Sequence, residues 1–163
     1  MTNVNLNFST SEVTDMAEMF DKTYKLDSLD LRRFNTTKVE DMSNMFNQCT
    51  GLKEINLKDF STDNVSNMAS MFLKCSSLVS LDLSFFKTDK VKEVQHLFEG
   101  CSSLQEINLS NFNTEKVNNM QGMFKGCSKL KALDLSNFDT KTVTTMKTMF
   151  KDDEALVSLD LSK

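Results

Sequence analysis

The sequence predicts an α/β solenoid: a right-handed superhelix of about six coils, with a concave parallel β-sheet and short helices on its convex side. Three observations predict this fold. Residues of one kind recur every 26 positions without an insertion, and each copy changes its apolar period once. Proline is absent, whereas methionine (11) and phenylalanine (13) are abundant. No copy can bury its apolar residues alone, so neighbouring coils must cover them.

Several columns define the repeat. Phenylalanine, leucine, threonine and cysteine each recur at a fixed place in successive copies. The main columns are Phe20, Phe46, Phe72, Phe98, Phe124 and Phe150; Leu26, Leu52, Leu78, Leu104, Leu130 and Leu156; Thr36, Thr62, Thr88, Thr114 and Thr140; and Cys49, Cys75, Cys101 and Cys127.

The first half of each copy predicts a strand. In "LKEINL", residues 52–57, Ile55 and Leu57 alternate as one apolar face. Glu54, Asn56 and Lys58 should then point to the opposite face. Stacked coils would place such strands side by side in a parallel sheet.

The second half predicts a helix of two to three turns. Thr62 precedes this stretch and suits an N-cap. Gly100 and Gly126 follow the last helical phenylalanine in two copies, where a left-handed residue would end the helix. The apolar residues at helical spacing are Val65, Met68, Met71, Phe72 and Cys75.

The chain reads as a single domain, residues 1–163. Residues 1–25 form an irregular N-terminal coil, because Asn3 and Asn5 stand where later copies carry leucine. We expect residues 26–151 to form regular repeats and residues 152–163 to form a terminal strand, with truncation of the array there as one possibility. An uncovered sheet edge invites pairing, so we expect a longer native chain or edge-to-edge association with another chain at this coil.

The composition bounds the function. A net charge of −4 lacks the basic footprint of nucleic-acid binding. No apolar run reaches the roughly 18–20 residues that span a bilayer, so no membrane insertion is expected. The N-terminus has neither a basic start nor an apolar stretch, so no signal peptide is visible.

The cysteines and the single histidine predict packing rather than chemistry. A zinc site needs closely spaced pairs of ligands, whereas these cysteines are separated by whole coils. A catalytic cysteine needs a histidine, but His96 falls in a variable, mostly polar column. We expect reduced, buried thiols, no metal, no cofactor and no enzymatic activity.

The outer face of the strands is the candidate binding surface. Six acidic residues against two basic ones give it a net charge near −4. Two interpretations stay open: a solvated sheet face, or a mildly acidic concave surface for a basic or polar protein partner. Phe85 stands where other copies are polar, which suggests either an exposed contact or local packing. The candidate residues are Asp30, Arg32, Glu54, Asn56, Lys58, Asp82, Glu106, Asn108, Asp134 and Asp160.

The repeated pattern "LxxLxLxxF" is the leucine-rich-repeat signature, with Phe60 in the place usually held by asparagine or cysteine. A second repeated pattern, "FxTxxVxxMxxMFxxCxxL", accompanies it. With both patterns, the chain resembles the BspA-like leucine-rich repeats from Phe8 to Leu161. The resemblance implies a curved, non-enzymatic adhesion or recognition module at the cell surface or secreted. The absent signal and the unpaired cysteines favour the alternative, a cytoplasmic scaffold or assembly subunit.

Overall fold

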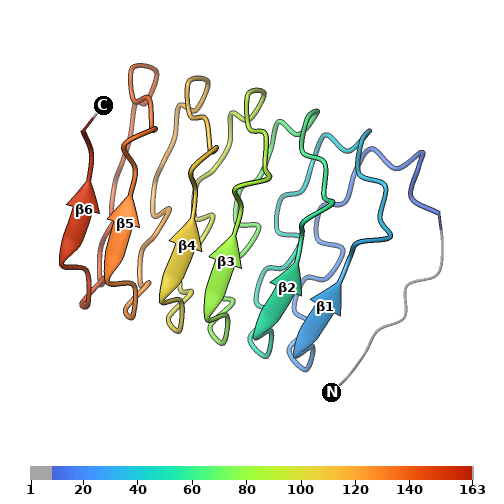
Figure 1. Ribbon diagram of the computed structural model, residues 1–163, viewed down its shortest axis with the longest axis horizontal. Coiled ribbons are helices and arrows are strands. Elements are labelled where there is room, and N and C mark those ends of the chain that lie inside the picture. Colours follow the sequence, from blue (N-terminus) through green and yellow to red (C-terminus); the bar gives the residue numbers. More distant parts are fainter. Residues whose placement is uncertain (1–8, 163) are drawn as a thin grey trace.

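A computed structural model describes residues 9–162, and the predicted irregular strand with Asn3 and Asn5 lies outside these residues. Six short strands stand in a row, one per coil, and all point the same way (Figure 1). Each is three residues long, and its central leucine or isoleucine is buried or half-buried in the first five strands and exposed in the last. Their bounds are β1 Ser28–Asp30, β2 Glu54–Asn56, β3 Ser80–Asp82, β4 Glu106–Asn108, β5 Ala132–Asp134 and β6 Ser158–Asp160.

The strands pair two by two rather than in one sheet. β1 pairs with β2, β3 with β4 and β5 with β6, each in parallel and in the register of the repeat. The breaks fall after β2 and β4, whose central residues are Ile55 and Ile107. Both isoleucines are half-buried, whereas Leu81 and Leu133 are buried. The six-coil parallel sheet of the sequence prediction is therefore divided into three parts.

The predicted convex helices are wrong: the part of the chain between residues 9 and 162 contains no helix. In a helix each N–H would bond four residues back, but here alternate N–H groups reach the next coil. Phe46 donates to the carbonyl of Met71 (2.9 Å) and Gln48 to that of Leu73 (2.7 Å). Consecutive turns use the N–H groups in between, as from Cys49 to the carbonyl of Phe46 (3.1 Å).

Left-handed residues make these turns possible. Asn44 (φ 56°) and Gln48 (φ 57°) each occupy the third position of a turn, and their counterparts in neighbouring coils also have positive φ. Gly100 and Gly126, both at φ 75°, adopt the left-handed conformation that the sequence predicted for them. They close turns and not helices, because their own N–H groups donate to the next coil, to the carbonyls of Lys125 (2.7 Å) and Lys151 (2.8 Å).

The turns on the side opposite the strands are also paired from coil to coil at equivalent positions of the repeat. Parallel bridges join Asp15 to Asp41, and each following coil repeats the bridge as far as Thr145. Both sides are therefore main chain at hydrogen-bonding distance, and neither is widened by a layer of helices. In a solenoid of strands and helices, the helix side is wider than the strand side, and this difference bends the row into a concave and a convex side. That difference is missing here, so we call the two sides the strand face and the turn face.

Aromatic rings and thiols fill the space between the two faces. Six phenylalanine rings stack in one file from Phe20 to Phe150, with centroids 5.4–5.9 Å apart. Phe46, Phe72, Phe98 and Phe124 are completely buried, as are the four cysteines beside them. The predicted cysteine packing is confirmed, and the methionines of the inner coils are buried beside the cysteines: Met45, for example, is 0% exposed, whereas Met146 in the last coil is exposed. Coil-to-coil stacking thus supplies the whole core.

The threonine column links neighbouring coils by hydrogen bonds. Thr62 Oγ1 donates to the carbonyl of Lys87 (2.9 Å) and accepts from its N–H (2.8 Å). Thr10 and Thr114 make the same double contact with the next coil. Thr62 was predicted to cap a helix, and this is wrong, because its hydroxyl bonds to the following coil.

Candidate functional site

All ten predicted site residues are exposed on the strand face. They alternate with the buried residues of each strand, so Asp82 and Ser80 point outward on either side of Leu81. Glu106 and Asn108 flank Ile107 in the same way. The structure thus brings the predicted residues to one surface.

The central column of this face also has a local structural role. Each of its Asp or Asn side chains accepts a hydrogen bond from the N–H two residues on, the pattern of an Asx turn. Asp82 Oδ1 accepts from Ser84 (3.0 Å), and Asn108 Oδ1 accepts from Ser110 (3.1 Å). Asp and Asn can alternate along this column because the turn needs only the oxygen that both possess.

The first acid of the face is neutralised locally. Arg32 Nε donates to both carboxylate oxygens of Asp30 (2.9 and 3.0 Å), and its Nη2 lies 2.6 Å from Oδ2. These hydrogen bonds lower the pKa of Asp30 to about 2. The negative charge of the strand face is therefore concentrated in the later coils, at Asp82, Glu106, Asp134 and Asp160.

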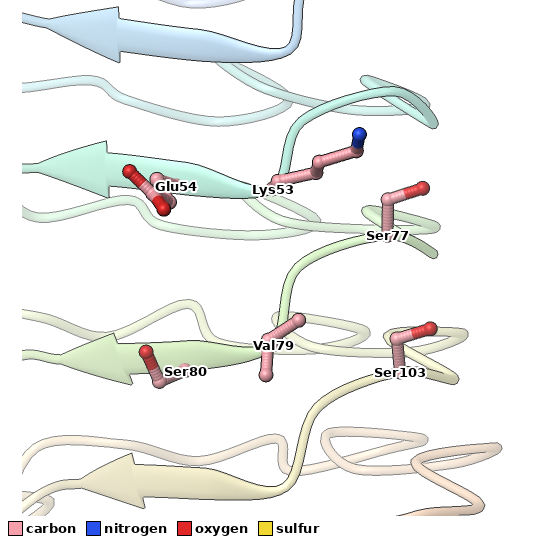
Figure 2. A pocket seen from close by; sticks show the side chains of 6 residues that line it. All are labelled: Lys53, Glu54, Ser77, Val79, Ser80 and Ser103. Atoms are coloured by element: carbon pink, nitrogen blue, oxygen red, sulfur yellow. The ribbon is translucent and has the colours of Figure 1, made fainter.

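Two depressions mark the breaks between strand pairs. One of about 510 Å³ lies between β2 and β3, and Figure 2 shows the ammonium of Lys53 on the same side as the hydroxyls of Ser77 and Ser103. Val79 lies directly before β3 beside this depression and is 44% exposed. Sequence reasoning missed Lys53 and Val79 because their column varies freely from copy to copy.

The second depression, of about 250 Å³, lies between β4 and β5. Asn108, Ser110, Asp134 and Ser136 are among the residues that line it. Hydrogen bonds from Ser136 lower the pKa of Asp134, so this carboxylate is charged at neutral pH. The face therefore offers a polar, negatively charged hollow at its later break.

Phe85 is 50% exposed. It follows β3 directly in the turn, in the column that holds Asn111 and Asn137 in later coils. Asn111 Nδ2 donates to the carbonyl of Ser84 (2.6 Å), a bond that a phenylalanine at this position cannot make. Phe85 thus places an apolar ring at a position where the repeat uses hydrogen bonding.

The cysteines are arranged as packing groups. All four are free and buried, and burial raises the pKa of each thiol. An unreactive, protonated thiol is the result. His96 lies on the turn face, where its Nδ1 is 2.5 Å from Glu99 Oε2.

Lys125 completes this turn-face cluster. Its ammonium donates to Glu99 Oε1 (2.7 Å) from the next coil. Burial opposes ionisation of Glu99, yet the hydrogen bonds from Lys125 and His96 keep its pKa below the ordinary value. Gly122 makes room for the histidine, since a Cβ there would lie 2.7 Å from His96 Nδ1. The cluster is an ion pair between neighbouring coils.

Neither a metal-binding cluster nor a membrane-spanning helix is found among the described residues. Among residues 9–162, no group of three His, Cys, Asp or Glu side chains could hold a metal ion. In the same part of the chain no helix is long and apolar enough to cross a membrane.

The fold and the columns define a repeat protein of the leucine-rich type. The chain belongs to the family described as "Mycoplasma protein of unknown function, DUF285", whose model matches residues 2–106 and again residues 77–163. Among solved structures, a leucine-rich repeat protein from Bacteroides ovatus ATCC 8483 is similar, with a TM-score of 0.50 and 18% identity.

That similarity covers 89% of this chain and 40% of the other chain, so this chain spans well under half of its length. At this identity the likeness concerns the fold alone. No curated protein matches the chain.

Proposed function

We propose that the chain is a non-enzymatic, cofactor-free protein-binding module of the BspA-like kind, which acts in surface adhesion or recognition. The observation that carries the proposal is the strand face of the later coils. There Asp82, Glu106, Asp134 and Asp160 are exposed, whereas Asp30 in the first coil is paired with Arg32. A face of this charge favours a basic or polar protein partner.

Neutral substitutions on the strand face should weaken binding without unfolding the protein. The triple variant Asp82→Asn, Glu106→Gln, Asp134→Asn keeps the oxygen that each Asx turn needs, as Asn108 does already. Lysine at positions 82 and 134 would remove that acceptor and so mix folding with binding. We expect adhesion of protein-coated beads to an epithelial cell layer to fall roughly ten-fold, because the electrostatic attraction is lost.

A matched control removes the same charge elsewhere. Glu40→Gln, Glu115→Gln, Glu154→Gln changes three exposed acids that lie off the strand face. It should leave bead adhesion unchanged. Equal losses in both triple variants would reject the strand face and point to net charge alone.

The location of the protein separates the two classes of function. Labelling of intact source cells with a membrane-impermeant amine reagent should modify the protein if it is displayed at the surface. Labelling only after lysis would favour the cytoplasmic scaffold and reject adhesion.

A second candidate function is assembly through the C-terminal coil. Val157 is 87% exposed and Leu161 is 60% exposed. β6 pairs with β5 on one side only among the described strands. Behind it a hollow of about 210 Å³ is lined by Met146, Phe150 and other apolar side chains. The partner that fits this edge is β6 of a second copy, paired about a two-fold axis.

We expect the wild-type chain to form dimers in sedimentation equilibrium as its concentration rises, and Val157→Lys, Leu161→Lys to abolish them. Val79→Lys is the control, because Val79 stands in the same column within the row and is also exposed. A wild-type chain that stays monomeric at its highest soluble concentration would exclude assembly through this edge.

A further inference from the structure

The cysteine column is a chain of hydrogen bonds between coils. Each thiol donates to the carbonyl of the phenylalanine 29 positions earlier: Cys75 to Phe46, Cys101 to Phe72 (both 3.1 Å), and Cys127 to Phe98 (3.3 Å). These carbonyls also accept from a backbone N–H three residues on. The thiol therefore fills the remaining lone pair of a buried oxygen.

Asp153 occupies the next place in this column. Its Oδ1 accepts a hydrogen bond from the N–H of Cys127 (2.8 Å). Its Oδ2 is buried and has no hydrogen-bond partner among the described residues. The carbonyl equivalent to those of Phe72 and Phe98 is that of Phe124, again 29 positions earlier. An ionised carboxylate cannot donate to this oxygen, whereas a neutral carboxyl group can.

We propose that Asp153 is a proton-linked clamp on the terminal coil. In its neutral form the Oδ2–H group donates to the carbonyl of Phe124 and takes the place of the missing thiol. Loss of the proton removes this bond and leaves a buried charged oxygen without a partner, which loosens the coil that carries β6.

The electrostatic surroundings support the neutral form. Burial and, to a smaller extent, the charge of neighbouring Asp152 raise the pKa of Asp153 to about 6, against the opposing effect of the nearby N–H groups of Cys127 and Gly126. Cys127, which packs against it from the preceding coil, stays uncharged because its own pKa is raised. Asp152 and Cys127 are thus the titratable groups that face Asp153.

The direction of the pH effect follows from this shift. The folded pKa lies above the unfolded value of 3.8, so the folded chain binds the proton more tightly. The stabilising contribution is full below about pH 4 and is lost as the pH rises through about 6. The difference between these two pKa values corresponds to about 100-fold in the opening equilibrium over the whole pH range, of which about ten-fold falls between pH 5 and pH 7.

Hydrogen exchange of the terminal coil, measured by NMR on the whole chain, tests the clamp. The amides of Leu156 and Val157 bond to the carbonyls of Asp153 and Lys131. After correction for intrinsic exchange, their protection should fall about ten-fold between pH 5 and pH 7. Asp153→Asn, which carries both a donor and an acceptor at every pH, should remove this dependence. Glu154→Gln, the exposed neighbour, should retain it.

The carboxyl carbon of Asp153 gives a readout that does not depend on any variant. Its chemical shift should titrate with a midpoint near pH 6 in the wild-type chain. A midpoint below pH 4.5, or equal protection of the terminal amides at pH 5 and pH 7, would overturn the proposal. Should Asp153→Asn fail to fold, Asp153→Cys restores the residue of the column and should give protection without pH dependence in this range.

Discussion

Phe98→Ala is expected to lower the free energy of unfolding by about 3–5 kcal/mol, the range for large-to-small changes of aromatic residues in a packed core. Phe98 is 0% exposed and stacks between Phe72 (5.9 Å) and Phe124 (5.4 Å). The neighbouring rings are held by backbone bonds between coils, so they cannot collapse into the cavity. Urea unfolding followed by circular dichroism measures the loss.

Phe85→Ala serves as the matched control. It removes the same side chain from a position that is 50% exposed, and should change the unfolding free energy by less than about 1 kcal/mol. Similar losses for Phe85 and Phe98 would contradict the stacked core. Because the array is one-dimensional, Phe98→Ala should also broaden the transition, since it weakens the contact between two halves of the row.

Thr62→Val is expected to cost about 2–4 kcal/mol, although it preserves the shape of the side chain. Thr62 is 2% exposed, and its hydroxyl satisfies both the carbonyl and the N–H of Lys87. Valine leaves both backbone groups without this partner in a site shielded from water. Thermal unfolding of the wild-type chain and the variant gives the difference.

The same column contains its own control. Thr140 is exposed at the last place of the column, where no described coil follows it. Thr140→Val should therefore change stability by less than about 0.5 kcal/mol. A loss there as large as at Thr62 would show that the threonine column acts within its own coil and not between coils.

The repeat columns predicted a large part of the fold. The recurrence of Phe, Leu and Cys fixed the register of the coils, and the alternation around Ile55 placed Glu54 and Asn56 outside, as observed. Each coil contacts chiefly its neighbours, so residues at equivalent positions of the repeat lie next to each other in space.

The helices could not be excluded in the same way. The spacing of Val65, Met68, Met71 and Phe72 suits a helix, but it suits consecutive turns that place the same residues inward equally well. The deciding property is the left-handed backbone at Asn44, Ser70 and their equivalents, which bear Glu, Asn, Ser, His and Thr as well as Gly. Residues so varied carry no common signal of positive φ.

The candidate site was predicted as a surface but not in its internal bonding. The pairing of Asp30 with Arg32 can be predicted from the sequence, because residues two apart in a strand point to the same face. The turn-forming role of Asp82 and Asn108 became apparent only with the hydrogen bonds to Ser84 and Ser110. The breaks between strand pairs coincide with the half-buried Ile55 and Ile107, and the column pattern does not display this difference from the buried Leu81 and Leu133.

The backbone ladders on both faces have a mechanical consequence. The inter-coil hydrogen bonds, such as those from Phe46 to Met71 and from Phe72 to Leu97, lie along the long axis of the row. A force that pulls the two ends apart along this axis opens one contact between coils at a time. Each opening releases 26 residues, or about 90 Å of extended chain. Under tension the molecule would lengthen in equal steps from an end, as an extensible tether.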